Sequence, residues 1–300
     1  MPRSFALWFR ALRFPFVTAS ALPYVCGGLY TRAPFRFWPF LLGLASVVFT
    51  HLAANLINDY ADSLSGADAH DRTYYGFFGG SKLIQEGRLS QRWYLLAASG
   101  FAAMAACSVA LLLVLQLAPA VTLVYFSGAL VLAWSYSHGP LRFAYRGWGE
   151  FVVFLLFGPV CVAGGMFLQL GYVPWLTAAC LSLPFGLLTV GILVANEVPD
   201  AVDDAAAGKR TLVVRLGAPA GHRLYAGLVA AAFAWITVAV LVGEANPWLL
   251  TSLAAAPVAW AAVRILGKSW RNKAELVRSS QLAILLQTLV GIALICWGRR

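Results

Sequence analysis

The chain of 300 residues is 61% hydrophobic and only 11% charged, and its mean hydropathy is +0.76. Its formal net charge is +10, from 22 Lys and Arg against 12 Asp and Glu. This composition excludes an ordinary soluble domain, in which about a quarter of the residues are charged. It predicts an all-α polytopic membrane protein, in which apolar stretches of about 20 residues cross the bilayer as helices.

Nine apolar stretches follow one another along the chain and predict nine transmembrane helices. They lie at residues 14–30, 37–57, 93–116, 120–137, 149–169, 173–195, 222–243, 247–266 and 281–297. They do not alternate polar and apolar residues, so a β-barrel is not expected. Since no flexible linker or low-complexity tract interrupts them, residues 1–300 are interpreted as a single membrane domain.

The basic residues predict the orientation of this domain. On the nine-span layout, one side of the membrane carries only Arg32, Arg36, Arg299 and Arg300, and every other Lys and Arg lies on the side of the N-terminus. The positive-inside rule therefore places the N-terminus in the cytoplasm and the protein in the inner (plasma) membrane. The positive net charge then reflects topology and attraction to anionic lipid, and nucleic acid is not an expected partner.

Two short acidic segments repeat one pattern, after the second and after the sixth predicted span. The first runs from Asn58 to Asp62 and the second from Asn196 to Asp200, so both read Asn-x-x-x-Asp. Together with the acids just beyond them they hold eight of the twelve acidic side chains: Asp59, Asp62, Asp68, Asp71, Glu197, Asp200, Asp203 and Asp204. Four spans separate the segments, so both are expected on the cytoplasmic side.

Helical spacing would bring the polar members of each segment onto one face. If the second span continues as a helix, Asn55, Asn58 and Asp62 share a face. A single such acid would be an ordinary loop residue or helix cap. Two matched clusters are not explained as ordinary loop residues or helix caps. Each carboxylate held at bilayer depth costs about 2.5–3.5 kcal/mol of insertion free energy, so several together need compensation. The two clusters predict a wet cavity at the cytoplasmic end of the bundle that holds cations.

Carboxylate and amide oxygens without suitably placed His or Cys favour a hard ion such as Mg²⁺. Mg²⁺ commonly joins one or two carboxylates to substrate phosphate oxygens. Basic residues near both segments are candidates for binding that phosphate, or are merely positive-inside anchors: Arg72, Lys82, Lys209 and Arg210. The turn at residues 79–81 could add backbone N–H groups. A diphosphate held at the membrane face indicates a lipid diphosphate as substrate. The metal ion and the basic residues would stabilise the diphosphate as it leaves the lipid chain.

Several further motifs resemble the UbiA superfamily of intramembrane prenyltransferases. The run Asn58-Asp59-x-x-Asp62, followed by Gly66-x-Asp68, is similar to the branch that prenylates 1,4-dihydroxy-2-naphthoate in menaquinone biosynthesis. Other runs resemble the same branch, in the same order: Gly79–Lys82, Glu86–Ser90, Tyr136–Pro140, Gly147–Glu150, Phe157–Pro159 and Gly208–Gly217. The resemblance implies nine transmembrane helices, Mg²⁺, a polyprenyl diphosphate donor and an aromatic acceptor.

The resemblance also implies roles for particular residues. Asn58, Asp62, Asp200 and Asp204 would bind the metal-diphosphate, and Asp59, Asp68, Asn55 and Asn196 would support them. Asp203 stands beside Asp204, so which of the two is a ligand stays open. Asp62 and Asp200 are the expected catalytic residues, together with Glu150, which would orient or deprotonate the acceptor or simply favour a helix start. His51, one turn before Asn55, is interpreted as an ordinary buried histidine.

Other functions compete with this interpretation. Within the superfamily, 4-hydroxybenzoate, homogentisate and a chlorophyllide are alternative acceptors. A cation-coupled transporter also uses repeated helices and intramembrane carboxylates, but its sites lie near the bilayer midplane. A CDP-alcohol phosphotransferase is disfavoured because its Asp-Gly-x-x-Ala-Arg core is absent. Prenyl chain length and oligomeric state are not predicted by any motif.

Overall fold

The computed structural model describes residues 2–30, 34–67 and 71–297, and these form helices and connecting loops without a β-strand. The helical elements are α1 (Pro2–Ala11), η1 (Phe14–Val17), α2 (Thr18–Leu29), α3 (Phe37–Ser65), α4 (Gln91–Val114), α5 (Val121–Trp134), α6 (Phe143–Arg146), α7 (Gly149–Leu155), η2 (Leu156–Val160), α8 (Cys161–Leu170), α9 (Trp175–Ala206), α10 (Leu212–Leu216), η3 (Ala218–Ala220), α11 (Gly221–Leu241), η4 (Pro247–Ala255), α12 (Ala256–Lys268) and α13 (Lys273–Trp297).

In the described part of the chain, seven helices are long and apolar enough to cross a membrane. The all-α polytopic membrane fold is therefore confirmed. Two shorter apolar helices, Phe14–Leu29 and Val121–Trp134, occupy the other two predicted positions. That all nine cross the bilayer stays a prediction, because these two are shorter than the roughly 20 residues a span needs.

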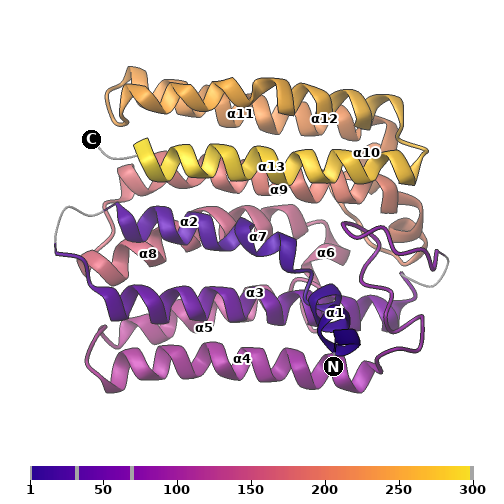
Figure 1. Ribbon diagram of the computed structural model, residues 1–300, viewed down its shortest axis with the longest axis horizontal. Coiled ribbons are helices and arrows are strands. Elements are labelled where there is room, and N and C mark those ends of the chain that lie inside the picture. Colours follow the sequence, from indigo (N-terminus) through magenta and orange to yellow (C-terminus); the bar gives the residue numbers. More distant parts are fainter. Residues whose placement is uncertain (1, 31–33, 68–70, 298–300) are drawn as a thin grey trace.

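The helices lie side by side along the longest axis of the molecule (Figure 1). Helices α11 and α12 form one edge, α13 and α9 follow, α2, α7 and α8 lie in the middle, and α3, α5 and α4 complete the bundle. Helix α9 is the most enclosed, since 78% of its most apolar 18-residue window is buried. Outer helices expose apolar side chains such as Val124 and Leu241, as expected for surfaces that face lipid.

Both acidic segments lie on helices. The predicted spans end at residues 57 and 195, but α3 continues to Ser65 and α9 to Ala206. With 29 and 32 residues, these helices are about 44 and 48 Å long, well beyond the roughly 30 Å of a bilayer core. The second span does continue as a helix, so Asn55, Asn58 and Asp62 share a helix face as expected. The helices extend beyond the predicted spans because hydropathy marks the apolar run and not the end of the helix that carries it.

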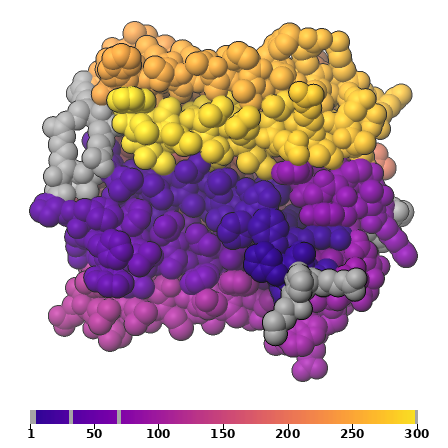
Figure 2. All heavy atoms as spheres, in the orientation of Figure 1, coloured from indigo at the N-terminus to yellow at the C-terminus, as the bar shows by residue number. Residues whose placement is uncertain are grey.

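The two acidic ends lie at the same end of the bundle, together with α1, α6 and α10, whereas the C-terminus lies at the opposite end (Figure 1). Helix α1, in indigo, covers part of this end beside the loop that follows α3 and below α13 (Figure 2). At the opposite end, the guanidinium of Arg36 donates to the carbonyl oxygens of Leu117 and Leu168 at 2.6 and 3.1 Å. Three of the four basic residues assigned to that side, Arg32, Arg299 and Arg300, lie outside the described residues.

Candidate active site

A cavity of about 310 Å³ runs inside the bundle and is polar at one end and apolar at the other. At the end where α3 and α9 project, its wall contains Asn58, Asp62 and Asp200. Toward the opposite end the wall is formed by apolar side chains such as Leu112 and Phe126. Such a cavity suits a molecule with an anionic head and a long apolar tail.

Two lysines join the acidic segments to each other. Lys209 Nζ lies 3.0 Å from Asp62 Oδ2 and 3.0 Å from Asp204 Oδ1. Lys273 Nζ lies 2.9 Å from Asp71 Oδ2 and 3.0 Å from Asp203 Oδ2. Each ammonium group therefore binds one carboxylate in or just after the first segment and one carboxylate just after the second. The distant parts of the chain converge as expected, and a cationic group already lies between them.

Two groups at this end, Lys209 and Asp71, are held in their ionised forms by neighbours of opposite charge. Burial alone would lower the pKa of Lys209, but the carboxylates of Asp62 and Asp204 outweigh burial and raise the pKa well above its usual value. Burial raises the pKa of Asp71, but the backbone N–H of Thr73 and the ammonium of Lys273 lower it, with a net result of about 2. The ammonium of Lys209 and the carboxylate of Asp71 are therefore both charged at neutral pH.

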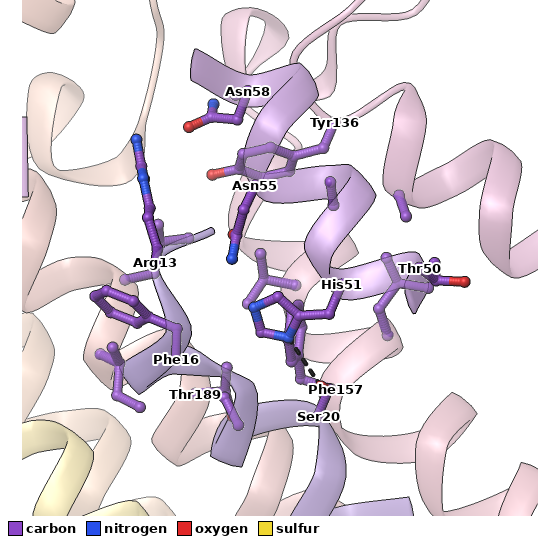
Figure 3. Close-up of a pocket in the computed structure, with 18 of the residues that line it drawn as sticks. Arg13, Phe16, Ser20, Thr50, His51, Asn55, Asn58, Tyr136, Phe157 and Thr189 are labelled. Atoms are coloured by element: carbon purple, nitrogen blue, oxygen red, sulfur yellow. Dashed lines mark hydrogen bonds between the residues drawn. The ribbon is translucent and has the colours of Figure 1, made fainter. Parts of the chain in front are cut away.

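The two asparagines of the repeat present oxygens to the cavity. Asn58 donates its amide nitrogen to Ser137 Oγ at 2.6 Å, so its Oδ1 is left as an acceptor in the cavity wall (Figure 3). Asn196 also lines the cavity, and its buried Oδ1 has no hydrogen-bond partner among the described residues. A buried acceptor without a donor is unfavourable unless a ligand satisfies it. Both oxygens are therefore suited to bind a cation.

The Gly-Gly-Ser turn, expected to bind a substrate anion, binds protein carboxylates instead. The backbone N–H of Gly79 donates to Asp200 Oδ2 at 2.7 Å, and that of Ser81 donates to Asp59 Oδ2 at 3.1 Å. Gly79, with a φ of +68°, has the left-handed conformation that glycine allows most readily. The turn thus ties the two acidic helices together. Its next residue, Lys82, is buried and lines the cavity, and its role in diphosphate binding stays a prediction.

Other predicted site residues lie apart from the cavity. Asp59 is buried and forms an ion pair with Arg13, and it does not line the wall. Arg72 and Arg210 are exposed and do not line it either. Glu150 is buried, and its carboxylate accepts a hydrogen bond from the backbone N–H of Leu212 at the start of α10. Their roles in metal binding, diphosphate binding and catalysis stay predictions.

Asn55 lines the cavity, but its amide nitrogen donates to the carbonyl oxygen of Leu12 at 3.0 Å. Asp203 also lines the wall, where it is held by Lys273. Asp204, not Asp203, shares Lys209 with Asp62, so Asp204 is the better-placed partner for the first segment. Asp68 lies outside the described residues.

Lys273 and Arg13 line the cavity and were not identified as site residues from the sequence. Lys273 is the first residue of α13, where the helix dipole disfavours a cation. That unfavourable position was the available signal that an anion lies nearby. Arg13 precedes the first predicted span and offered no signal beyond its basic charge.

Aromatic groups surround the middle of the cavity. Of the tyrosines near the acidic segments, Tyr75 and Tyr136 line it, whereas Tyr145 stands behind Asp62 with its hydroxyl 3.1 Å from Asp62 Oδ1. Phe157 lies in the π-helical turn η2, where Pro159 cannot donate the usual backbone hydrogen bond. Such turns are frequent at functional sites.

Among the described residues, no three His, Cys, Asp or Glu side chains gather closely enough to form a ready metal site. The carboxylates are instead held by the two lysines. The donor set nevertheless fits Mg²⁺, because carboxylate oxygens and two acceptor oxygens of asparagines from opposite helices face one cavity. Mg²⁺ typically binds one or two carboxylates together with phosphate oxygens of a substrate. It would therefore use only some of these carboxylate and asparagine oxygens as ligands.

Comparison with known proteins identifies the family of this chain. The model of the UbiA prenyltransferase family matches residues 20–293. A 1,4-dihydroxy-2-naphthoate octaprenyltransferase of Mycobacterium tuberculosis is 34% identical over 99% of both chains. The apo structure of a UbiA homolog from Aeropyrum pernix superposes with a TM-score of 0.70 at 21% identity, covering 93% of this chain and 97% of that one.

A UbiA homolog from Archaeoglobus fulgidus, whose structure contains GPP and Mg²⁺, superposes with a TM-score of 0.63 at 17% identity. The superposition covers 97% of this chain and 99% of that one. These structures share the fold of this protein, and the match of the family model extends over nearly its whole length. The chain therefore belongs to the UbiA prenyltransferase family and is a membrane prenyltransferase.

Proposed function

We propose that this enzyme transfers a polyprenyl group from a polyprenyl diphosphate to 1,4-dihydroxy-2-naphthoate in a Mg²⁺-dependent reaction of menaquinone biosynthesis. The observation that carries the proposal is Lys209, which binds Asp62 and Asp204 at the polar end of an otherwise apolar cavity. This arrangement joins both acidic segments where a diphosphate head would lie. The apolar remainder of the cavity suits a prenyl chain.

Asn58, Asp62, Asp200 and Asp204 would hold Mg²⁺, with Asn196 supplying a further oxygen. Mg²⁺ bound there would neutralise charge on the diphosphate as the bond between carbon and oxygen breaks. The presence of GPP and Mg²⁺ in the structure of the Archaeoglobus fulgidus homolog supports the use of Mg²⁺ with a prenyl diphosphate. Lys82, Lys209 and Lys273 line the same end, and their ammonium groups would stabilise the departing diphosphate.

Breaking this bond leaves positive charge on the allylic end of the prenyl group. The faces of Tyr136 and Phe157, both in the cavity wall, would stabilise it by cation–π attraction. The new carbon–carbon bond forms at the acceptor carbon that carries the carboxylate, which leaves as carbon dioxide. Water must be excluded while the cation exists, and the apolar side chains that line the deeper part of the cavity favour this.

The acceptor assignment rests on relatives. The Mycobacterium tuberculosis relative and a second one from Bacillus subtilis, 26% identical over 80% of this chain, are both named 1,4-dihydroxy-2-naphthoate octaprenyltransferases. The basic residues at the acidic end support a cytoplasmic location for that end and for the N-terminus, with the protein in the inner (plasma) membrane. The single bundle of helices supports one domain over residues 1–300.

Product analysis tests the proposal directly. Purified protein in lipid vesicles would receive Mg²⁺, polyprenyl diphosphates of several lengths, and 1,4-dihydroxy-2-naphthoate, 4-hydroxybenzoate or homogentisate. Mass spectrometry should detect a prenylated, decarboxylated naphthalene product that disappears when EDTA removes the metal. Prenylation of another acceptor in preference to the naphthoate would contradict the acceptor assignment. Turnover that continues at full rate in EDTA would contradict the role of Mg²⁺.

A further inference from the structure

A histidine lies in the cavity wall below the acidic end. His51, Asn55, Asn58 and Asp62 all line the cavity and are spaced four, three and four residues apart, so they form one stripe along α3. At 1.5 Å per residue, His51 lies about 10 Å from Asn58 and about 16 Å from Asp62 along the helix. Its side chain, 6% exposed, is therefore deeper than the region proposed for the diphosphate.

The hydrogen bonds of Ser20 determine which ring nitrogen of His51 carries the hydrogen. The Ser20 hydroxyl donates to the carbonyl oxygen of Val17 at 3.1 Å, and its oxygen lies 2.8 Å from His51 Nδ1. Because a hydroxyl has only one hydrogen, a Ser20 hydroxyl that donates to Val17 accepts from Nδ1–H. No carboxylate contacts the ring within the described part of the chain, and an unpaired buried charge is costly, so the ring is neutral. Its Nε2 is then an unprotonated acceptor.

The Nε2 atom of His51 faces the open space between Asn55 and Phe16, away from Ser20 (Figure 3). It has no hydrogen-bond partner among residues 2–30, 34–67 and 71–297. Phe157 packs edge-on against the ring, with centroids 5.2 Å apart, and holds its orientation. The wall thus presents a fixed acceptor to whatever occupies the cavity.

Helix α9 contributes another polar group to the cavity wall. Thr189 on α9 lies seven residues before Asn196, as His51 lies seven residues before Asn58. It is buried and lines the cavity, and its Oγ1 has no partner in the described residues. The repeat that brings the two acidic segments together therefore also creates a second polar level, formed by His51 and Thr189.

We propose that His51 and Thr189 bind the hydroxyl groups of the aromatic acceptor, with His51 Nε2 accepting a hydrogen bond from a phenolic O–H. This inference rests on the proposed function and adds the position of the acceptor to it. A prenyl chain has no donor, so packing it against both groups would leave their polar atoms unsatisfied. A hydroxylated ring satisfies them and lies between the second polar level and the diphosphate-bearing end of the prenyl group.

Two substitutions at His51 separate this role from a structural one. In His51→Asn, the amide N–H can still donate to Ser20, but no atom replaces Nε2. In His51→Gln, the amide reaches the position of Nε2 and can present an oxygen there. His51→Asn should raise the KM for 1,4-dihydroxy-2-naphthoate about tenfold and leave the KM for polyprenyl diphosphate unchanged. His51→Gln should recover most of the affinity for the acceptor.

A methylated probe tests the hydrogen bond without catalysis. In equilibrium dialysis, 1,4-dimethoxy-2-naphthoate should bind the wild-type protein about tenfold more weakly than the dihydroxy compound. This difference should shrink in His51→Asn, because the part of it that comes from His51 Nε2 is lost in a double-mutant cycle. Thr189→Val should also weaken binding of the dihydroxy compound, whereas Thr237→Val, the same change on α11 away from the cavity, should not.

An unchanged acceptor KM in His51→Asn, an equal rise in both KM values, or equal binding of the two probes by the wild type would overturn the inference. These results differ from a failure of the proposed function, in which the wild-type protein prenylates no naphthoate at all. If His51→Asn does not fold, His51→Gln, Thr189→Val and the methylated probe still decide the matter.

Discussion

Lys209 and Lys273 each bind a carboxylate from α3 or the loop after it and a carboxylate from α9. Without these ammonium groups, the carboxylates would repel one another across the mouth of the cavity. The same positions suit divalent cations, which also bring like-charged oxygens together. The lysines therefore keep the two acidic helices in register and can turn to phosphate oxygens when a diphosphate with its metal binds.

Removal of either principal aspartate should abolish activity without unfolding the protein. Asp62→Ala and Asp200→Ala should each lower kcat/KM by about 10²-fold or more, because charge stabilisation of the leaving diphosphate is lost. The loss is measured by product formation, and folding by the amount of monodisperse protein extracted from membranes. Glu86→Gln is the matched control, since Glu86 lies at the same end but only pairs with Arg10 on the surface. Near wild-type turnover in either alanine variant would refute the assigned site.

Glu150 offers a separate test at the residue scale. Its carboxylate accepts a hydrogen bond from the N–H of Leu212, so its visible contact is structural. Glu150→Gln keeps an acceptor oxygen and should change kcat/KM by less than about threefold, whereas Glu150→Ala should destabilise the protein by about 1–3 kcal/mol. Thermal unfolding and kinetics would be compared. A large loss of kcat in Glu150→Gln, with unchanged stability, would show that the carboxylate acts in catalysis.

Among the elements, the crossing of α2 and α8 depends on glycine. A Cβ atom at Gly27 would collide with the carbonyl group of Val162, and one at Gly165 would collide with that of Tyr24. Small residues allow such close approach between membrane helices. The crossing holds α2 in the middle of the bundle, where Ser20 reaches His51.

Gly27→Val should therefore disrupt this crossing. The forced separation should cost at least about 1–3 kcal/mol and lower the Tm in detergent. Gly100→Val is the matched control, because a side chain at Gly100 on α4 meets no atom within 4 Å. Equal Tm values for the two variants would show that the glycine contact does not limit stability.

The π-helical turn η2 is a second consequence of local chemistry. Pro159 removes one backbone donor, and the helix from α7 to α8 accommodates the loss with a wider turn. This turn places Leu156, Phe157 and Val160 in the cavity wall. Sequence alone indicated a proline within a span but could not indicate which side chains the altered turn would direct inward.

At the scale of the whole molecule, all identified polar chemistry lies at or near one end of the bundle. In a background with the five cysteines replaced by alanine, Arg210→Cys and Tyr172→Cys introduce exposed thiols at opposite ends. An impermeant maleimide should label Arg210→Cys only from the cytoplasmic side and Tyr172→Cys only from the other. Labelling of both from the same side would contradict the topology.

The sequence by itself determined the all-helical membrane fold, the repeated Asn-x-x-x-Asp pattern and the resemblance to prenyltransferases. These features depend on hydropathy and helical spacing, which are local properties of the chain. Only the tertiary structure decided that Lys273 and Arg13 join the site, that Gly79 and Ser81 bind carboxylates, and that His51 presents a free acceptor. Those contacts join residues far apart in sequence, and they exist only because helix packing brings their side chains within hydrogen-bond distance.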